Sequence, residues 1–206
     1  NQYHIFTSTN LLNWKDEHKP IKDSYECPDF FELPVDGNRS DMKWVLIQGS
    51  GKYSIGTFDG TEFKEETPRY ACDIGPNFYA TQTWNEMPDG RRVQIAWMSG
   101  GQYPGMPFNQ QMTFPRELTL RTTSAGVRLF REPICGIAQL HGQESDWPAQ
   151  TLRDGASMPL RNGGECFHIQ AEVDIPANTR LTFHICGGEV VLTHDTIESA
   201  HPLFAG

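Results

Sequence analysis

The sequence lacks several features by which common protein classes are identified. It has no Cys-x-x-Cys pair, and its five cysteines are an odd number, so neither a zinc ribbon nor a complete disulfide framework is expected. No apolar run reaches the length that a membrane-spanning helix needs, and helical periodicity is nearly absent. We therefore expect a soluble all-β chain with no membrane span.

Positive charge is also scarce. Lys and Arg number 17 against 26 for Asp and Glu, which gives a formal net charge of −9. Because such a surface repels phosphate backbones, nucleic acid is not an expected partner. The chain starts at Asn1 without an initiator Met or a signal-peptide pattern, and we expect this start to be processed or truncated.

Short strands joined by tight turns fill most of the first 130 residues. Alternating apolar residues and Gly-rich turns predict strands at 3–8, 30–35, 42–49, 52–58, 61–66, 78–85, 91–98, 112–122 and 127–130. The strands between 42 and 66 form a meander whose last member is polar enough to be an edge. Since propeller repeats run about 40 to 50 residues with four strands each, this region predicts roughly three blades of a β-propeller.

The pattern changes after residue 131. A short helical or irregular segment is expected first, and alternating apolar residues then predict strands at 165–175, 181–185 and 188–195. We expect the C-terminal part of a propeller at 1–135, a linker at 136–160 and the beginning of a β-sandwich domain at 161–206.

The segment YECPDFFELP, residues 25–34, places two carboxylates around a Cys-Pro pair. Pro28 removes a backbone donor and favours an extended Cys27, so Glu26 should lie on a loop or at the start of a strand. A carboxyl group beside an apolar wall suits a general acid, because desolvation disfavours its charged form. From these residues alone, a solvated loop glutamate is the alternative.

The order of motifs resembles glycoside hydrolase family 32, the levanases, exo-inulinases and invertases, and is most similar to the bacterial levanase branch. The matching segments are YECPDFFELPVDG (25–37), FYATQTW (78–84), IAWM (95–98), MTFPRELTL (112–120) and LFREPICGIAQL (129–140). The first resembles the Glu-Cys-Pro-Asp motif of the family, and the last resembles its connection to a C-terminal β-sandwich.

The resemblance implies a five-bladed propeller and retaining hydrolysis of β-fructofuranosides such as levan, inulin or sucrose, without a metal or cofactor. Glu26 matches the acid/base of the family. Tyr79 and Trp97 match positions near the sugar, with packing in the blade core as the alternative. Asp29 and Cys27 are further substrate-binding candidates, with support of Glu26 and simple packing as their alternatives. Secretion or a periplasmic location is expected from the family.

Two motifs of the family are absent. Its nucleophilic Asp lies in an Asn-Asp-Pro-Asn motif and another Asp in an Arg-Asp-Pro motif, and neither occurs here. Asp59, Asp73 and Asp89 occupy turn or inter-strand positions without that context. The sequence thus predicts an incomplete enzyme that carries Glu26 but not its partner; a non-catalytic carbohydrate-binding or structural propeller fragment is the alternative.

Three further sets of residues receive structural predictions. Trp14, Trp44 and Trp84 are assigned to packing, and Arg116 and Glu117 are expected to form an ion pair between strands. Alternation places Cys166, His168, His184 and Cys186 on one face of a hairpin, but their spacing does not match a zinc finger, so exposed polar positions are the better interpretation.

Overall fold

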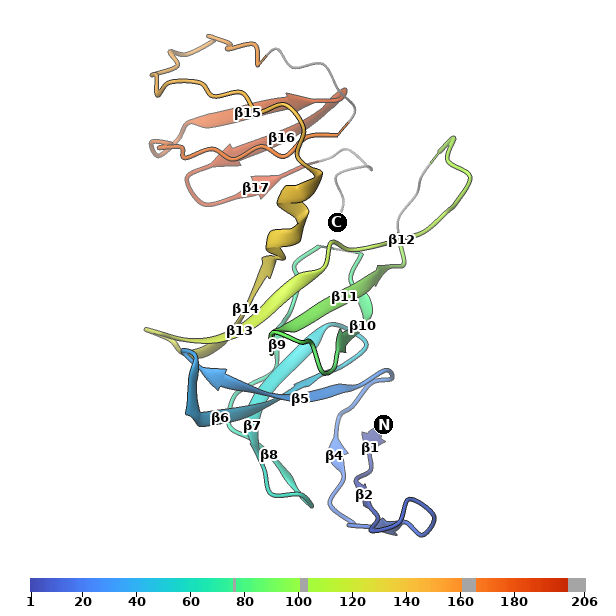
Figure 1. Ribbon diagram of the computed structural model, residues 1–206. Coiled ribbons are helices and arrows are strands. Elements are labelled where there is room, and N and C mark those ends of the chain that lie inside the picture. The colour runs from blue at the N-terminus through green and yellow to red at the C-terminus, as the bar shows by residue number, and fades with distance from the viewer. Residues whose placement is uncertain (76, 101–103, 161–165, 200–206) are drawn as a thin grey trace. The chain divides into compact units, whose positions relative to one another are not determined.

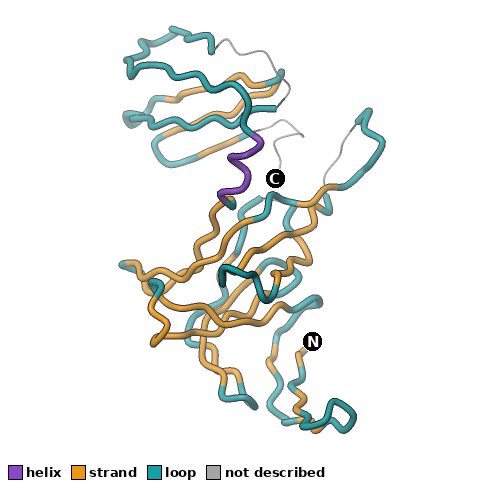
Figure 2. Tube along the Cα trace, viewed as in Figure 1, coloured by secondary structure: helices purple, strands orange, loops and turns teal. Residues whose placement is uncertain are grey.

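The computed structural model describes residues 1–75, 77–100, 104–160 and 166–199. These residues are all-β apart from one 3-10 helix, η1, at Cys135–Leu140 (Figures 1 and 2). The chain divides into two compact units, one over Asn1–Ile134 and one that begins at Cys135. No helix in the described ranges is long and apolar enough to cross a membrane.

A ten-stranded sheet forms most of the first unit (Figure 1). Its order is β10 (Tyr79–Trp84), β11 (Arg92–Met98), β13 (Arg116–Thr123), β5 (Asp29–Val35), β6 (Asn38–Ile47), β7 (Lys52–Phe58) and β8 (Phe63–Glu65). The remaining strands are β9 (Tyr70–Ala71) beside β7, β12 (Gln111–Met112) beside β11 and β14 (Gly126–Pro133) beside β13. Strands β6, β7 and β8 form the predicted antiparallel meander, with β8 at the end of the order.

One pairing in this sheet joins distant parts of the chain. Strands β13 and β5 are parallel and share a single register pair, Leu120 opposite Val35. Next to this pair, the Asp36 backbone N–H donates to the Leu120 carbonyl at 2.9 Å. The contact places the two series of antiparallel strands side by side in one sheet.

The packing follows from the alternation of side chains along the strands. In β5, Phe31, Leu33 and Val35 are buried whereas Glu32 between them is exposed, as the period of two requires. The main cluster combines Phe31, Leu33, Val35, Val45, Ile47, Tyr53, Ile55, Leu118 and Leu120. A second cluster joins Ile21, Leu46 and Phe63 and connects the N-terminal segment to the sheet.

The N-terminal strand predicted at 3–8 is wrong. The chain forms four two-residue strands instead: β1 (Gln2–Tyr3), β2 (Phe6–Thr7), β3 (Lys15–Asp16) and β4 (Ile21–Lys22). Because β1 pairs with β4 while β2 pairs with β3, the two halves of the predicted strand follow different partners and cannot remain continuous.

The packing prediction for the tryptophans is correct for only one of them. Trp44 lies 4.5 Å from Phe30 and 5.0 Å from Phe58 between ring centroids. Trp14 and Trp84 are exposed. Trp14 lies in the short hairpin of β2 and β3, which pair only with each other. Trp84 is the last residue of β10, the first strand in the sheet order. Neither side chain therefore has a neighbouring strand to cover it.

The second unit contains a three-stranded antiparallel sheet of β15 (Arg180–Ile185), β16 (Gly188–Thr193) and β17 (Ile197–Glu198). Cys186 and Gly187 connect β15 to β16, and both have positive φ, 49° and 81°. Positive φ at both central residues is the geometry of a type I′ turn, which matches the twist of a two-residue hairpin.

The strand predicted at 165–175 is wrong over its described part. Residues 166–178 contain no strand, and the alternating Phe167, Ile169 and Val173 are exposed. An apolar face stabilises a strand only when another layer covers it, and the described part of the second unit holds a single three-stranded sheet. The β-sandwich, the linker and the domain limits stay predictions.

Candidate active site

Glu26 lies on an exposed bend between β4 and β5, where its carboxylate accepts a hydrogen bond from the hydroxyl of Tyr79. Tyr79 is the first residue of β10 and pairs with Trp97 of β11. The Tyr79 ring meets the Trp97 ring edge to face at 6.0 Å and the Tyr25 ring at 6.3 Å between centroids. The structure thus brings the predicted residues Glu26, Tyr79 and Trp97 together.

In this hydrogen bond the Tyr79 hydroxyl is the donor. Bonding to the Glu26 carboxylate raises the pKa of Tyr79, so the phenol stays protonated and acts as the donor. The carboxylate of Glu26 is the acceptor and keeps an exposed surface. A carboxylate that is exposed and held by one neutral donor can exchange protons with a molecule bound from solvent.

Gly49, which the sequence does not single out as a site residue, holds this arrangement in place. Its N–H donates to the Glu26 carbonyl at 2.7 Å, and its own carbonyl accepts the N–H of Ala80 at 2.9 Å. A Cβ atom at Gly49 would lie 2.4 Å from the Glu26 carbonyl oxygen. The backbones that carry Glu26 and Tyr79 therefore meet at a position that only glycine fits.

Replacing Gly49 with Ala should destabilise the chain by about 1–3 kcal/mol, because the added methyl group forces the Glu26 backbone to move. Urea denaturation followed by circular dichroism measures this loss. Gly142→Ala is the matched control, since a Cβ there meets no atom within 4 Å. Equal stability of both variants would show that the Gly49 contact relaxes without cost.

Cys27 does not have the extended backbone that the sequence predicts. Its φ is +53°, in the left-handed region, and its side chain is exposed. The hydrogen bond from Gly49 to the Glu26 carbonyl turns the chain immediately before Pro28, and the left-handed conformation avoids the right-handed region that a following proline disfavours. Cys27 is therefore part of the bend that presents Glu26.

Asp29 is the first residue of β5, and its carboxyl group is directed toward β10. Burial raises the pKa of its carboxyl group, while hydrogen bonds from Thr83 and the charge of Arg92 act in the opposite direction. Its Oδ2 atom is buried without a hydrogen-bond partner. Asp29 thus follows the bend that carries Glu26 and is bonded to Thr83 of β10.

Three aspartates, Asp59, Asp73 and Asp89, lack the sequence context of the family's catalytic motifs, and each has a local structural role. Asp59 accepts the N–H groups of Thr61 and Glu62 in a turn, and the first of these bonds does most to lower its pKa to about 2. Asp73 pairs with an arginine of β14, and Asp89 pairs with the arginine two residues later. Each of the three carboxylates is thus bonded to partners in its own turn or ion pair.

The predicted ion pair between Arg116 and Glu117 is wrong. Successive residues of a strand point to opposite faces. Both residues lie in β13, and Glu117 is instead 3.7 Å from Arg91. The pleat of the strand therefore separates the two charges.

The histidines and cysteines of the second unit do not gather into a metal site. His168 contacts His141 at 2.9 Å, and His184 lies 3.2 Å from Glu189. Cys166 and Cys186 are exposed free thiols. Within the ranges that the structure describes, no group of three or more metal-ligating side chains is found.

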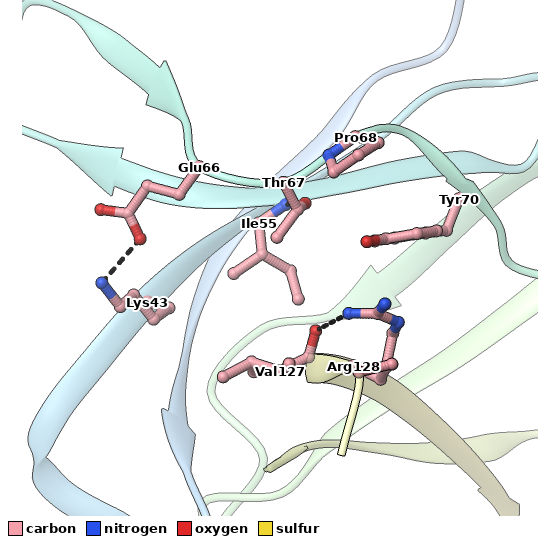
Figure 3. Close-up of a pocket in the computed structure, with 10 residues that line it drawn as sticks. Lys43, Ile55, Glu66, Thr67, Pro68, Tyr70, Val127 and Arg128 are labelled. Atoms are coloured by element: carbon pink, nitrogen blue, oxygen red, sulfur yellow. Dashed lines mark hydrogen bonds and ion pairs between the residues drawn. The ribbon is translucent and has the colours of Figure 1, made fainter. Parts of the chain in front are cut away.

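A separate cavity of about 300 Å³ lies in the first unit between β6, β7 and the β13–β14 hairpin (Figure 3). Lys43 and Glu66 form an ion pair of 2.7 Å at one side. At the other side the Arg128 guanidinium lies 4.2 Å from the centre of the Tyr70 ring. Figure 3 shows these two side chains next to each other. None of the predicted site residues lines this cavity.

Fold and site together define an all-β domain of the propeller type with an exposed, tyrosine-bonded glutamate. The chain belongs to glycoside hydrolase family 32, because the model of the "Glycosyl hydrolases family 32 N-terminal domain" matches residues 1–133. This confirms the resemblance found in the sequence.

Curated relatives and solved structures agree with this assignment. The chain is 34% identical to a levanase of Bacillus subtilis over 87% of its own length and 30% of the relative. It is 34% identical to an extracellular exo-inulinase of Aspergillus niger over 63% of the chain and 29% of the relative. The crystal structure of an exo-inulinase from Aspergillus awamori matches 64% of the chain and 31% of that protein, with a TM-score of 0.55 and 28% identity. The chain thus spans about 30% of the length of such relatives.

Proposed function

We propose that this chain is the acid/base-bearing part of a longer, secreted glycosidase that releases fructose from β-fructofuranosides. The observation that carries the proposal is the exposed Glu26 carboxylate held by Tyr79 beside Trp97, in a chain of family 32. The relatives named as levanase and extracellular exo-inulinase support a fructan or sucrose as substrate and a location outside the cell.

In the proposed reaction Glu26 protonates the leaving oxygen and later removes a proton from water. A retaining glycosidase needs a second carboxyl group about 5 to 5.5 Å away to attack the anomeric carbon. Asp59, Asp73 and Asp89 are engaged in turns and ion pairs, and the Asn-Asp-Pro-Asn motif that carries the nucleophile in the family does not occur in this sequence. The proposal therefore takes the nucleophile from another part of the longer protein. Neither a metal nor a cofactor has a step in this reaction.

The neighbours of Glu26 have supporting roles in the proposal. Tyr79 orients the carboxylate through its hydroxyl, and Trp97 supplies an apolar wall beside the bound sugar. Cys27 contributes the left-handed bend that exposes Glu26. Asp29 positions the start of β5 against β10 through its hydrogen bonds with Thr83.

The alternative is a non-catalytic carbohydrate-binding or structural fragment. The described part of the chain holds no second carboxylate bonded into the Glu26 site, and covalent catalysis then has no attacking group. Under this alternative Tyr79 and Trp97 serve only as a sugar-binding surface.

Fructose release from levan, inulin and sucrose tests the proposal. We expect no release by the isolated 206-residue chain and measurable release by the longer protein that contains it. Activity of the isolated chain would contradict the need for an external nucleophile. Inactivity of the longer protein on all three substrates, with retained sugar binding, would favour the non-catalytic alternative.

A further inference from the structure

A row of apolar side chains crosses three strands beside Glu26. Tyr79 of β10 stands directly opposite Trp97 of β11, and Trp97 in turn stands opposite Met112 of β12. Directly opposite residues of paired strands project from the same face of the sheet, so these three side chains lie side by side. The row begins at Glu26, because the Tyr79 hydroxyl donates to the Glu26 carboxylate.

Backbone hydrogen bonds fix Met112 at the end of this row, where β12 lies beside the end of β11 (Figure 1). The Thr113 N–H donates to the Ala96 carbonyl at 2.9 Å, and the Ala96 N–H donates to the Thr113 Oγ1 at 3.1 Å. Thr113 follows Met112 in the chain, and Ala96 precedes Trp97. Met112 is therefore anchored beside Trp97 although β12 has only two residues.

Met112 is anchored but not buried, since it is 51% exposed. A single exposed methionine is ordinary, because apolar atoms form a large part of any protein surface. Met112 differs in that it continues a row that starts at the candidate acid/base, with Trp97 between the two ends. Its flexible, polarisable thioether can adapt to the apolar face of a ligand that lies along the row.

The row is longer than a single sugar ring. Neighbouring strands lie about 4.8 Å apart, so the two spacings from Tyr79 to Met112 amount to roughly 10 Å, which is the length of a disaccharide. A glycosidase that releases one fructose at a time holds a single ring on the side that becomes the product. A surface longer than one ring therefore belongs to the remainder of the substrate, which departs with the leaving oxygen.

We propose that Met112 determines specificity by contacting the second sugar unit on the leaving side of Glu26 when the substrate is a β-fructofuranosyl oligosaccharide. The inference rests on the proposed function of Glu26. Trp97 contacts the first leaving unit and Met112 the next one, each through the C–H groups of the sugar. Sucrose has only one unit on that side, so it does not reach Met112. The row thus favours fructan chains over sucrose.

Steady-state kinetics of the longer protein on sucrose and on an inulin-type tetrasaccharide test the proposal. Met112→Ala should raise KM for the tetrasaccharide about 3- to 10-fold, because the contact with one apolar side chain is lost. The kcat on both substrates and the KM for sucrose should stay unchanged, since this contact binds ground state and transition state alike. Met112→Leu, which keeps an apolar side chain of similar size, should retain the KM of the unmodified protein.

Met42→Ala is the matched control. Met42 is a partly exposed methionine of β6 that stands opposite Pro34 of β5, outside the row, and its replacement should leave both KM values unchanged. Equal KM changes on sucrose and the tetrasaccharide in Met112→Ala, or no change on either, would overturn the proposal.

Two further readouts separate this proposal from other roles of Met112 and from the proposed function. If Met112 packs against another part of the longer protein, Met112→Ala will lower Tm without changing the preference for chain length, and the proposal is then wrong. If the longer protein releases no fructose, the proposed function fails, and calorimetric titration with both sugars decides on Met112 separately. A loss of tetrasaccharide affinity relative to sucrose in Met112→Ala would support the contact, and equal affinities would overturn it.

Discussion

Fructose release by the longer protein should fall by about 10²- to 10⁴-fold when Glu26 is replaced with Gln, because a positioned general acid contributes a factor of this size. Gln keeps the volume of the side chain and still accepts the hydrogen bond of Tyr79. The loss should therefore reflect the missing proton, and steady-state kinetics on levan, inulin and sucrose will measure it.

Glu32→Gln is the control for this variant. Glu32 is an exposed glutamate of β5, six positions further along, and its replacement should leave the rate unchanged. A second readout follows from Tyr79: without the carboxylate its pKa should fall toward the ordinary value of 10, as a spectrophotometric phenol titration will show. Full activity of Glu26→Gln would remove Glu26 from the mechanism.

Replacing Leu120 with Ala should lower the free energy of unfolding by about 2–5 kcal/mol, the usual range for a core leucine. Leu120 is 0% exposed and belongs to the main core cluster. It also lies at the parallel pair with Val35, where its carbonyl accepts the Asp36 N–H. Urea denaturation of the 206-residue chain will measure the change.

An exposed leucine provides the comparison. Leu12 is 83% exposed, so Leu12→Ala should change the free energy of unfolding by no more than about 0.5 kcal/mol. If Leu120→Ala were equally mild, the junction between β13 and β5 would not be part of the cooperative core, and the ten strands would unfold as separate groups.

Strands with a partner close in the sequence were predictable. In β5 to β8, the alternation and the Gly-rich turns define both the strands and their pairing, since each strand bonds to the next. Residues 3–8 and 166–175 show the same kind of alternation but lack a continuous partner, and the strands predicted there are wrong. Alternating apolar residues form a strand only when a neighbouring strand supplies backbone hydrogen bonds and another layer covers the apolar face.

The residues of the candidate site could be selected from the sequence where a motif contains them. The features that depend on contacts between distant backbone segments could not. Glu26, Tyr79 and Trp97 could be selected from their motifs, and the structure brings them together. The left-handed Cys27 and the close approach at Gly49 depend on two backbones, distant in sequence, that meet in space. No periodicity or composition reports such a contact.

The junction between β5 and β13 also bears on how the chain folds during synthesis. Thr122 donates its N–H to the Asp36 side chain at 2.9 Å across a separation of 86 residues. Contacts of this range form slowly, because a long loop must close before they contribute. One edge of β5 therefore emerges from the ribosome long before β13 exists, and during that interval it is open to pairing with another nascent chain. Conditions that slow translation between residues 36 and 122 should favour such misassembly.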